Sequence, residues 1–363
     1  MKILVTYSSA GAGHLKAAEA VYKELQEREG VSVVFVDALD YTSESFKNSY
    51  RGGYSFLIAK ASWLWGLAFA ICDIPWLQGL FKYVRKYYNG FFANNFEEYL
   101  IKEQFDCILS THFLPTEVSS RLKKNQEISS KLITIITDFD VHRIWLADYV
   151  DYYAVACQHT KEKLIRLNVD KKKIVITGIP IDKCFTKSYD ISDLRIKLGL
   201  EPNVFTVLIA TGSFGIGPME QIIYPLDEDI QVVAICGSNK ELYKILSNKK
   251  RNLLKVMGLV NNMPEWMAVA DVMITKPGGL SLTEALASQL PVIFFSAIPG
   301  QEINNVKVLQ KEGIGVYCKK KRIVDEINRL KASRDLLKTH IRRSRTLARL
   351  DAARAVGDLV LDV

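Results

Sequence analysis

The sequence lacks several features that would mark a metal-bound, secreted or membrane-spanning protein. Its six cysteines are scattered over 363 residues without a C-x-x-C pair, which argues against a zinc site or a disulfide framework. The apolar run 61–72 is too short for a membrane-spanning helix, which needs about 20 residues. The chain opens with a short apolar run that polar residues follow at once, so we expect a buried strand rather than a secretory signal. A reducing, cytosolic location is the simplest expectation.

The composition that is present is that of a globular protein. Hydrophobic residues make up 48% of the chain and charged residues 24%. At about 150 residues per domain, the length predicts two domains. The formal charge of +8 favours an anionic partner, which could be nucleic acid, an anionic bilayer or a phosphorylated substrate. Much of the excess lies between Lys319 and Arg354, where a solvated helix face explains it equally well.

Short aliphatic runs alternate with helical patterns, as in parallel βαβ units. In the first half we expect a helix over 14–28 and strands at 3–6, 31–36, 106–109, 132–137, 153–156 and 173–176. In the second half we expect helices over 240–248 and 280–288 and strands at 205–210, 231–235, 253–257, 272–275, 292–294 and 315–317. The pattern predicts an α/β protein of two Rossmann-like domains that face each other across a cleft, with ligands at the carboxyl ends of the strands.

We place the first domain at residues 1–185 and the second at 186–344, with a C-terminal helix over about 345–363 that packs back on the first domain. The join lies near residues 180–200.

One region departs from this alternation. Between residues 41 and 98 the chain carries most of its tryptophans and many other aromatic residues. The stretch 77–89 is amphipathic, because leucine and aromatic residues fall on one helical face while Lys82, Arg85 and Lys86 fall on the other. Such a pattern suits a helix that lies in a membrane interface. The alternative is an ordinary surface helix with its apolar face in the core.

A glycine-containing motif, residues 8–14, lies between the first strand and the first helix. Its glycines allow a ligand to approach the backbone, and a helix N-terminus favours negative charge. The motif lacks the third glycine of a dinucleotide fingerprint and the Gly-Lys-Ser/Thr of a P-loop. His14 follows the glycines directly, and the helix start disfavours its charged form. A neutral histidine there is a candidate general base, and a residue that only caps or packs the turn is the alternative.

A second motif spans residues 275–284. The turn 277–279 (Pro-Gly-Gly) follows a predicted strand, and Ser281 lies near a helix start. Exposed amides and a hydroxyl at a helix N-terminus suit a diphosphate. Glu284, one helical turn further, can accept hydrogen bonds from both hydroxyls of a ribose. Ser281 and Glu284 also match a capping box, and the two interpretations are compatible.

Two further loops follow predicted strands of the second half. Residues 299–305 (Pro-Gly-Gln-Glu-Ile-Asn-Asn) carry amide and carboxylate groups that suit sugar hydroxyls, although a polar loop with an N-cap would read the same. Residues 211–217 (Thr-Gly-Ser-Phe-Gly-Ile-Gly) could lie under the diphosphate or the acceptor, and a flexible connection fits equally well.

Taken together, these motifs resemble the MurG-like superfamily of GT-B glycosyltransferases, and within it the monogalactosyldiacylglycerol synthase and processive diacylglycerol glucosyltransferase branch. The resemblance covers nearly the whole chain. It is carried by residues 11–20, by 137–145 (TDFDVHRIW) with 160–162 and 178–181, and by 262–267 with 276–279 and 299–302. The last group is the most specific, and MurG-type enzymes generally lack the TD-x-x-x-H-x-x-W stretch.

The resemblance implies an inverting transfer of a hexose from a UDP-sugar to the hydroxyl of diacylglycerol, by a peripheral protein at the cytoplasmic face of the cell membrane. The UDP-sugar and diacylglycerol would be substrates and an anionic membrane surface a partner. We expect no nucleic acid, no cofactor and no protein-bound metal, because backbone amides and helix dipoles can stabilise the leaving diphosphate. His14 would be the catalytic base. The first domain would bind the acceptor and the membrane, and the second the UDP-sugar.

The resemblance also implies two sets of binding residues. Glu284 would hold the ribose, the backbone at Leu259 and Val260 would bind the uracil, and the Pro-Gly-Gly turn would hold the diphosphate. The donor set is Gly13, Gly212, Ser213, Phe214, Leu259, Val260, Met263, Pro277, Gly278, Gly279, Ser281, Glu284, Gln301, Glu302 and Asn305. The acceptor and membrane set is Trp63, Trp65, Phe69, Trp76, Phe81, Lys82, Arg85, Asp138, His142 and Trp145.

One departure concerns Ser9, where plant-type synthases carry an acidic residue. It argues against acid-assisted activation of His14 and away from plant-type galactose transfer. The alternatives to this function are MurG-type transfer of N-acetylglucosamine to a polyprenyl-linked precursor, UDP-sugar epimerisation, and nucleotide-sugar binding without turnover. The sequence is compatible with glucose or galactose and with one or several transfers.

Overall fold

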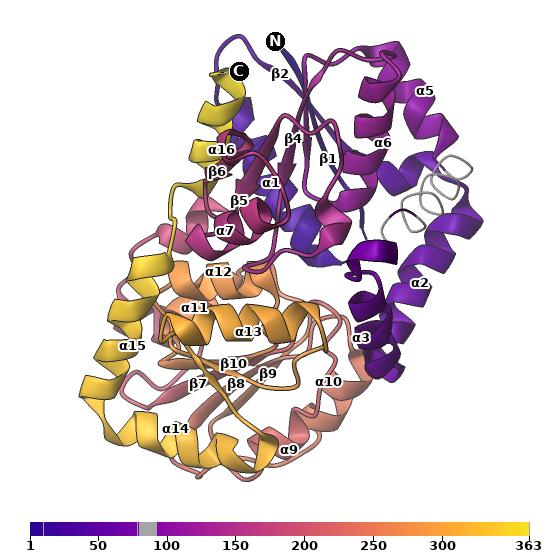
Figure 1. Ribbon diagram of the computed structural model, residues 1–363. Coiled ribbons are helices and arrows are strands. Elements are labelled where there is room, and N and C mark those ends of the chain that lie inside the picture. Colours follow the sequence, from indigo (N-terminus) through magenta and orange to yellow (C-terminus); the bar gives the residue numbers. More distant parts are fainter. Residues whose placement is uncertain (10, 78, 80–92, 363) are drawn as a thin grey trace. The chain divides into compact units, whose positions relative to one another are not determined.

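The computed structural model describes the whole chain except residues 10, 78, 80–92 and 363 (Figure 1). The chain divides into two compact units. The first unit comprises residues 1–182, 298–304 and 349–363, and the second comprises 183–297 and 305–348. In the part of the chain that the structure describes, each unit contains one six-stranded sheet.

The sheet of the first unit is parallel throughout, in the order β2-β1-β3-β4-β5-β6. Each predicted strand of this half lies within two residues of an observed one. The strands are β1 (Lys2–Tyr7), β2 (Ser32–Asp37), β3 (Cys107–Ser110), β4 (Lys131–Ile135), β5 (Tyr152–Val155) and β6 (Ile174–Ile176).

Helices cover both faces of this sheet, which explains why its strands are apolar at consecutive positions. Ile3 and Val5 of β1 pack with α1 and α16, whereas Leu4 between them packs with α5 and α6, because successive strand residues point to opposite faces. The helices of the first unit are α1 (Ala12–Gln26), α2 (Glu44–Lys60), α3 (Ser62–Ile71), α5 (Asn94–Glu103), α6 (Phe113–Lys124), α7 (Gln158–Arg166) and α16 (Ala352–Leu361).

The C-terminal helix α16 belongs to the first unit and packs against α1. Val356 and Val360 enter the same apolar cluster as the buried face of α1. Arg28, just after α1, pairs with Asp358 at 2.7 Å.

The sheet of the second unit is also parallel, in the order β12-β11-β10-β7-β8-β9. β8, β10 and β11 have the predicted bounds. The strands are β7 (Thr206–Ala210), β8 (Gln231–Ile235), β9 (Leu254–Met257), β10 (Val272–Thr275), β11 (Val292–Phe294) and β12 (Val316–Tyr317). The helices are α8 (Ile191–Lys197), α9 (Glu220–Ile223), α10 (Lys240–Ser247), α11 (Met263–Val269), α12 (Gly279–Ala287), α13 (Gln301–Lys311, which begins in the first unit), α14 (Ile323–Ala332) and α15 (Arg334–Leu347).

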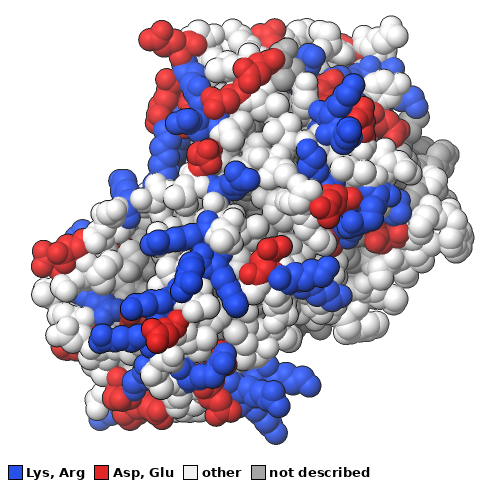
Figure 2. Space-filling view, turned by 60° about the vertical axis from the view of Figure 1, so that its left-hand side comes forward, with Lys and Arg blue, Asp and Glu red and all other residues white. Residues whose placement is uncertain are grey.

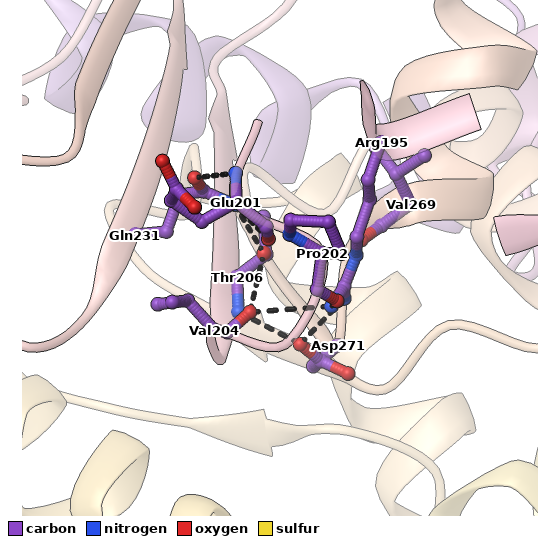
Figure 3. A network of polar contacts seen from close by, with 8 residues as sticks. All are labelled: Arg195, Glu201, Pro202, Val204, Thr206, Gln231, Val269 and Asp271. Atoms are coloured by element: carbon purple, nitrogen blue, oxygen red, sulfur yellow. Dashed lines mark hydrogen bonds and ion pairs between the residues drawn. The ribbon is translucent and has the colours of Figure 1, made fainter. Parts of the chain in front are cut away.

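A buried polar network closes the amino ends of β7, β8 and β10 (Figure 3). Arg195 of α8 pairs with Asp271 at 2.9 Å, and Asp271 accepts a hydrogen bond from the amide of Thr206 at 2.7 Å. Gln231 donates to the Thr206 hydroxyl at 2.9 Å. The Arg195 guanidinium also donates, at 2.8 to 3.2 Å, to the carbonyl oxygens of Pro202, Val204 and Val269. The network fastens α8 and the segment after it to the sheet.

Basic side chains gather over the second unit on the side that carries α14 and α15 (Figure 2). Several of them are bound within the unit. Lys331 pairs with Asp229 at 2.6 Å, Arg329 pairs with Glu326 at 2.7 Å, and Arg345 donates to Gln289 at 2.8 Å. These contacts agree with the interpretation that the positive charge of this region lies on a solvated helix face.

Candidate functional site

The order of the first sheet reverses between β1 and β3, because the chain adds β2 on one side of β1 and β3 on the other. Ligands of parallel α/β sheets bind beside such a reversal, at the carboxyl ends of the strands. The glycine motif 8–14 follows β1, and Thr111 and His112 follow β3. The fold therefore brings these residues to the same edge of the sheet.

His14 lies in the first turn of α1, and its ring is fixed from one side. Nδ1 lies 2.7 Å from the carbonyl oxygen of Thr111 and 3.1 Å from the hydroxyl of Thr137. Because a carbonyl can only accept, Nδ1 carries the proton and donates it to Thr111. The neutral ring therefore has its unprotonated nitrogen at Nε2, where it can accept a proton.

Burial keeps this histidine neutral. It lowers the pKa of His14 to about 4, while the hydrogen bond to Thr111 acts in the opposite direction. The ring of His112 lies edge-on to that of His14, with centroids 4.7 Å apart, and burial lowers the pKa of His112 well below its ordinary value. The sequence predicted a lowered pKa for His14 from its place at a helix start, and the largest cause in the structure is burial.

The glycine motif is tethered through Ser9. Arg51 of α2 donates from Nε to the Ser9 hydroxyl at 2.9 Å and pairs with Asp37 at 3.2 Å. Asp37 is buried at the end of β2 and also accepts a hydrogen bond from the Ser9 amide at 3.3 Å. An arginine and a carboxylate from two other elements thus hold Ser9 in place.

In the second sheet the order reverses between β7 and β10. The loop 211–217 follows β7 and forms a hydrogen-bonded turn. Gly212 has a φ of 82°, a conformation that favours glycine, and the amide of Gly215 donates to its carbonyl at 3.1 Å. The amide of Ser238, after β8, donates to the carbonyl of Ser213 at 2.8 Å. The loop is therefore a defined turn at the position where a ligand of this sheet would bind.

Helix α12 begins directly after β10 and the predicted diphosphate turn. Its N-cap is Gly278, which makes no side-chain cap hydrogen bond, so Ser281 and Glu284 lie inside the helix and do not form a capping box. A Cβ atom at Gly278 would meet no other heavy atom within 4 Å. The first-turn amides of α12 are therefore approachable by an anion. Asn305 is buried and donates to the carbonyl of Pro277 at 3.1 Å, so it supports this turn.

Other predicted donor residues follow β9 at the same edge of the second sheet. Leu259 is 71% exposed, and Val260 beside it is partly exposed. Met263 is the first residue of α11. Glu284 is partly exposed on α12.

Two predicted sets of residues meet in the first unit. Gln301, predicted for the donor, donates from Nε2 to Oδ2 of Asp138, predicted for the acceptor, at 2.7 Å. The Glu302 carboxylate accepts a hydrogen bond from the amide of Ile298 at 2.8 Å.

The TD-x-x-x-H-x-x-W stretch is buried rather than exposed, and it supports α3. His142 accepts from the amide of Ile144 at Nδ1, so its Nε2 carries the proton and donates to the carbonyl of Phe69 at 2.9 Å. The rings of Phe69 and His142 are in contact, tilted by 33° with centroids 3.9 Å apart. Trp145 is buried, and its ring centroid lies 6.0 Å from that of His14.

The other residues predicted to contact the membrane differ in their exposure to solvent. Trp63 and Trp76 are 68% and 80% exposed, and Trp65 is partly exposed. The predictions at Phe81, Lys82 and Arg85 lie outside the described residues. Within the described residues, none of the helices combines the length and apolar character that crossing a bilayer requires. The same part of the chain contains no group of three or more His, Cys, Asp and Glu side chains that could hold a metal ion.

Comparison with known proteins connects both units to one kind of enzyme. Residues 14–181 match the monogalactosyldiacylglycerol (MGDG) synthase family, and residues 207–354 match the glycosyltransferase family 28 C-terminal domain. The chain is 32% identical over 339 residues to the processive diacylglycerol beta-glucosyltransferase of Staphylococcus aureus (strain Newman), covering 86% of this chain and 80% of that protein. The chain belongs to the monogalactosyldiacylglycerol synthase family of glycosyltransferases.

Solved structures support the fold of this glycosyltransferase. MurG of Acinetobacter baumannii aligns with a TM-score of 0.64 at 15% identity, over 100% of this chain and 99% of MurG. The calicheamicin glycosyltransferase CalG4 aligns with a TM-score of 0.64 at 12% identity, over 99% of this chain and 97% of CalG4. With its two six-stranded parallel sheets, the chain has the GT-B fold. The expected family and fold class are thereby confirmed.

Sequence reasoning about this glycosyltransferase missed the residues around His14. Thr111 and His112 follow a strand that was predicted, so their place at a carboxyl end was available from the sequence. Their proximity to His14 depends on β3 pairing with β1. Arg51 had no local signal, because α2 brings it to Ser9 from more than 40 residues away.

Proposed function

We propose that this glycosyltransferase moves a hexose from a UDP-sugar to the hydroxyl of diacylglycerol, with inversion at the anomeric carbon. The observation that carries the proposal is the state of His14. Its Nδ1 donates to the Thr111 carbonyl, and its pKa is lowered to about 4, so near neutral pH the ring is uncharged and its unprotonated nitrogen is Nε2. The relative that is 32% identical over 86% of this chain is named for diacylglycerol, which supports the choice of acceptor.

The donor would be held by the second unit. A diphosphate fits the uncapped N-terminus of α12, where amides and the helix dipole stabilise negative charge. Glu284 would accept hydrogen bonds from the ribose hydroxyls, and the backbone at Leu259 and Val260 would bind the uracil. Asn305 of α13 donates a hydrogen bond to the Pro277 carbonyl and would thereby keep the turn in place.

The reaction is then a single displacement. The acceptor oxygen forms a bond to the anomeric carbon on the face opposite UDP, while its proton passes to Nε2 of His14. The bond from the anomeric carbon to the phosphate oxygen breaks, and its electron pair leaves with UDP. The amides at the start of α12 would stabilise the charge that develops on the leaving group.

We propose further that the protein acts as a peripheral protein at the cytoplasmic face of the membrane, and that α3 and the segment after it touch the lipid. Large apolar side chains are exposed there. Trp63 is 68%, Leu67 50% and Trp76 80% exposed. Exposed tryptophan and leucine side chains on a short helix suit the interfacial region of a bilayer.

The test is transfer by the purified protein. Vesicles that contain diacylglycerol are incubated with UDP-glucose and with UDP-galactose in turn, and lipids are separated by thin-layer chromatography. A new glycolipid with a diacylglycerol base is expected with at least one donor. No glycolipid from folded protein that binds the donor would overturn the proposal. Product on a polyprenyl-linked acceptor alone would favour MurG-type transfer, and interconversion of UDP-sugars without acceptor would favour an epimerase.

Attachment to lipid is tested separately by vesicle flotation. We expect the wild-type protein to float with anionic vesicles and a Trp63→Ala, Trp76→Ala variant to remain largely at the bottom of the gradient. Tyr243→Ala provides a matched control, because Tyr243 is an exposed aromatic residue of the second unit. Equal flotation of all three proteins would contradict the assignment of α3.

A further inference from the structure

The segment 298–304 follows a strand of the second sheet but belongs to the first unit by its contacts. Its turn fits closely against α3. Gly300 has a φ of 89°, and a Cβ atom there would lie 2.6 Å from Cδ1 of Phe69. A Cβ atom at Gly66 of α3 would lie 2.5 Å from Cβ of Pro299. Glycine is therefore required on both sides of this contact, because any larger residue would push the turn away.

The turn presents Gln301 to a buried carboxylate. Asp138 is 3% exposed, and its Oδ2 lies 2.7 Å from Nε2 of Gln301. An ionised carboxylate only accepts hydrogen bonds, so the amide group of Gln301 must turn its nitrogen toward Asp138. Its carbonyl oxygen Oε1 then lies on the other side of the amide. The carboxylate thus determines both the position of the Gln301 side chain and which atom it offers to a ligand.

We propose that Asp138 is a positioning residue for recognition of the transferred hexose. It holds Gln301 so that Oε1 accepts a hydrogen bond from a hexose hydroxyl. This inference rests on the proposed function, to which it adds Gln301, a residue that the sequence predicted for the donor, as a contact of the transferred sugar, and it deepens that function. It gives the TD-x-x-x-H-x-x-W stretch a part in recognising the transferred hexose.

This role of Asp138 should affect the affinity for UDP-hexose and not the affinity for UDP. UDP has no hexose, so its affinity does not depend on Gln301 or Asp138. We expect Asp138→Ala and Gln301→Ala each to weaken binding of UDP-hexose by about fivefold to tenfold, the effect of one hydrogen bond, and to leave binding of UDP unchanged. Isothermal titration calorimetry on the full-length protein, with UDP and with UDP-hexose, measures both. A variant that lost affinity for both ligands equally would show a general structural role and overturn the proposal.

The sharpest test exchanges the amide of residue 301 and the carboxylate of residue 138. Gln301→Glu places two carboxylates against each other and should weaken UDP-hexose binding most. Asp138→Asn in the same protein restores an amide opposite a carboxylate, now with the donor on position 138, and leaves an oxygen of residue 301 for the hexose. We expect the double variant to bind UDP-hexose within about twofold of wild type, a strongly non-additive result. Additive losses would contradict the proposal.

Asp140→Asn is the matched control. Asp140 lies two residues further along the same stretch, and it contacts His159 and Lys163 instead of Gln301. Its variant should bind UDP-hexose as the wild type does. Because binding is measured without acceptor, the outcome is independent of the acceptor's identity. Wild-type protein that binds UDP-hexose but makes no glycolipid would overturn the proposed function alone, whereas wild-type protein that binds no UDP-hexose would overturn both.

Discussion

The two ends of the second sheet are built from opposite kinds of residue. At the amino ends, Arg195, Asp271 and Gln231 are joined in a buried network of hydrogen bonds (Figure 3). At the carboxyl ends, Gly212 and Gly278 leave space that a Cβ atom would enter without contact. A buried polar group without a partner costs about 1–3 kcal/mol of stability, so a network that pairs these groups with one another stabilises the fold. Its hydrogen-bonding groups are then used within the protein rather than offered to a ligand. The amides at a helix start have no partner within the helix, so a bound ligand supplies the hydrogen bonds that they lack.

The first sheet has the same polarity. Its carboxyl end carries His14 and His112, while the amide of Lys2 at the amino end of β1 is bound by Asp106 at 2.6 Å. The residues predicted to bind and react thus lie at one end of each sheet, and hydrogen-bonded networks lie at the other. Substitutions at the two ends should therefore separate activity from stability.

The largest effect is expected at the carboxyl end of the first sheet. His14→Ala should lower the rate of transfer by about 10³-fold, because a general base contributes on the order of 10²–10⁴. Affinity for UDP should be unchanged. Initial rates of glycolipid formation and calorimetric titration with UDP measure the two quantities. His159→Ala is the control, since His159 contacts Asp140. Unchanged transfer by the His14 variant would remove this residue from the mechanism.

At the amino end, Arg195→Ala should act on stability instead. It leaves Asp271, whose side chain is 33% exposed, without its cation and leaves three carbonyl oxygens without the guanidinium, so the free energy of unfolding should fall by about 1–3 kcal/mol. Urea unfolding followed by circular dichroism measures the loss, and the UDP affinity of the folded protein should equal that of wild type. Arg345→Ala removes an exposed arginine that contacts Gln289, and it should change the free energy of unfolding by less than about 0.5 kcal/mol. A loss of UDP affinity without loss of stability in the Arg195 variant would break the comparison.

A smaller effect is expected at Gly278. The backbone there has φ −73° and ψ 136°, which alanine adopts readily, and a Cβ atom meets no neighbour. Gly278→Ala should therefore keep its stability but weaken UDP binding by about tenfold, or ~1.4 kcal/mol, because the methyl group lies where the diphosphate approaches. Gly53→Ala, which also adds a methyl group in open space, is the matched control. Unchanged UDP affinity at Gly278 would argue against a diphosphate at α12.

The smallest effect concerns pH. The folded state holds the pKa of His14 at about 4, below the ordinary value of about 6.5 in the unfolded chain, and the pKa of His112 is shifted in the same direction. Between these values the unfolded state binds more protons, so the free energy of unfolding falls as the pH falls from about 6.5 toward 4. His14→Ala should reduce this dependence. Transfer should remain constant from pH 8 to about 6, because the base is already neutral. A rate that halves near pH 6.5 would contradict the lowered pKa.

The sequence was sufficient where local physics decides the outcome. The strands of both sheets were predicted within a few residues, because consecutive apolar positions bounded by polar loops admit few other structures. The Pro-Gly-Gly turn and the helix after it were predicted from their residue types. The helix predicted over 280–288 lies within one residue of α12 (Gly279–Ala287). Its N-cap was left open, since Ser281 and Glu284 match a capping box as well as a helix interior, and the observed N-cap at Gly278 decides between them.

The sequence by itself therefore determined the family, the two parallel sheets and the loops that end their strands. Tertiary structure alone decided which of those loops meet. The pairing of β3 with β1 brings Thr111 to His14. The turn at Gly300 fits closely against Phe69, and the same turn presents Gln301 to Asp138. These contacts join residues about 100 or more positions apart, and hydrophobic periodicity carries no information at that range. A carbonyl oxygen or a buried carboxylate acquires its role only when folding places a partner within hydrogen-bonding distance.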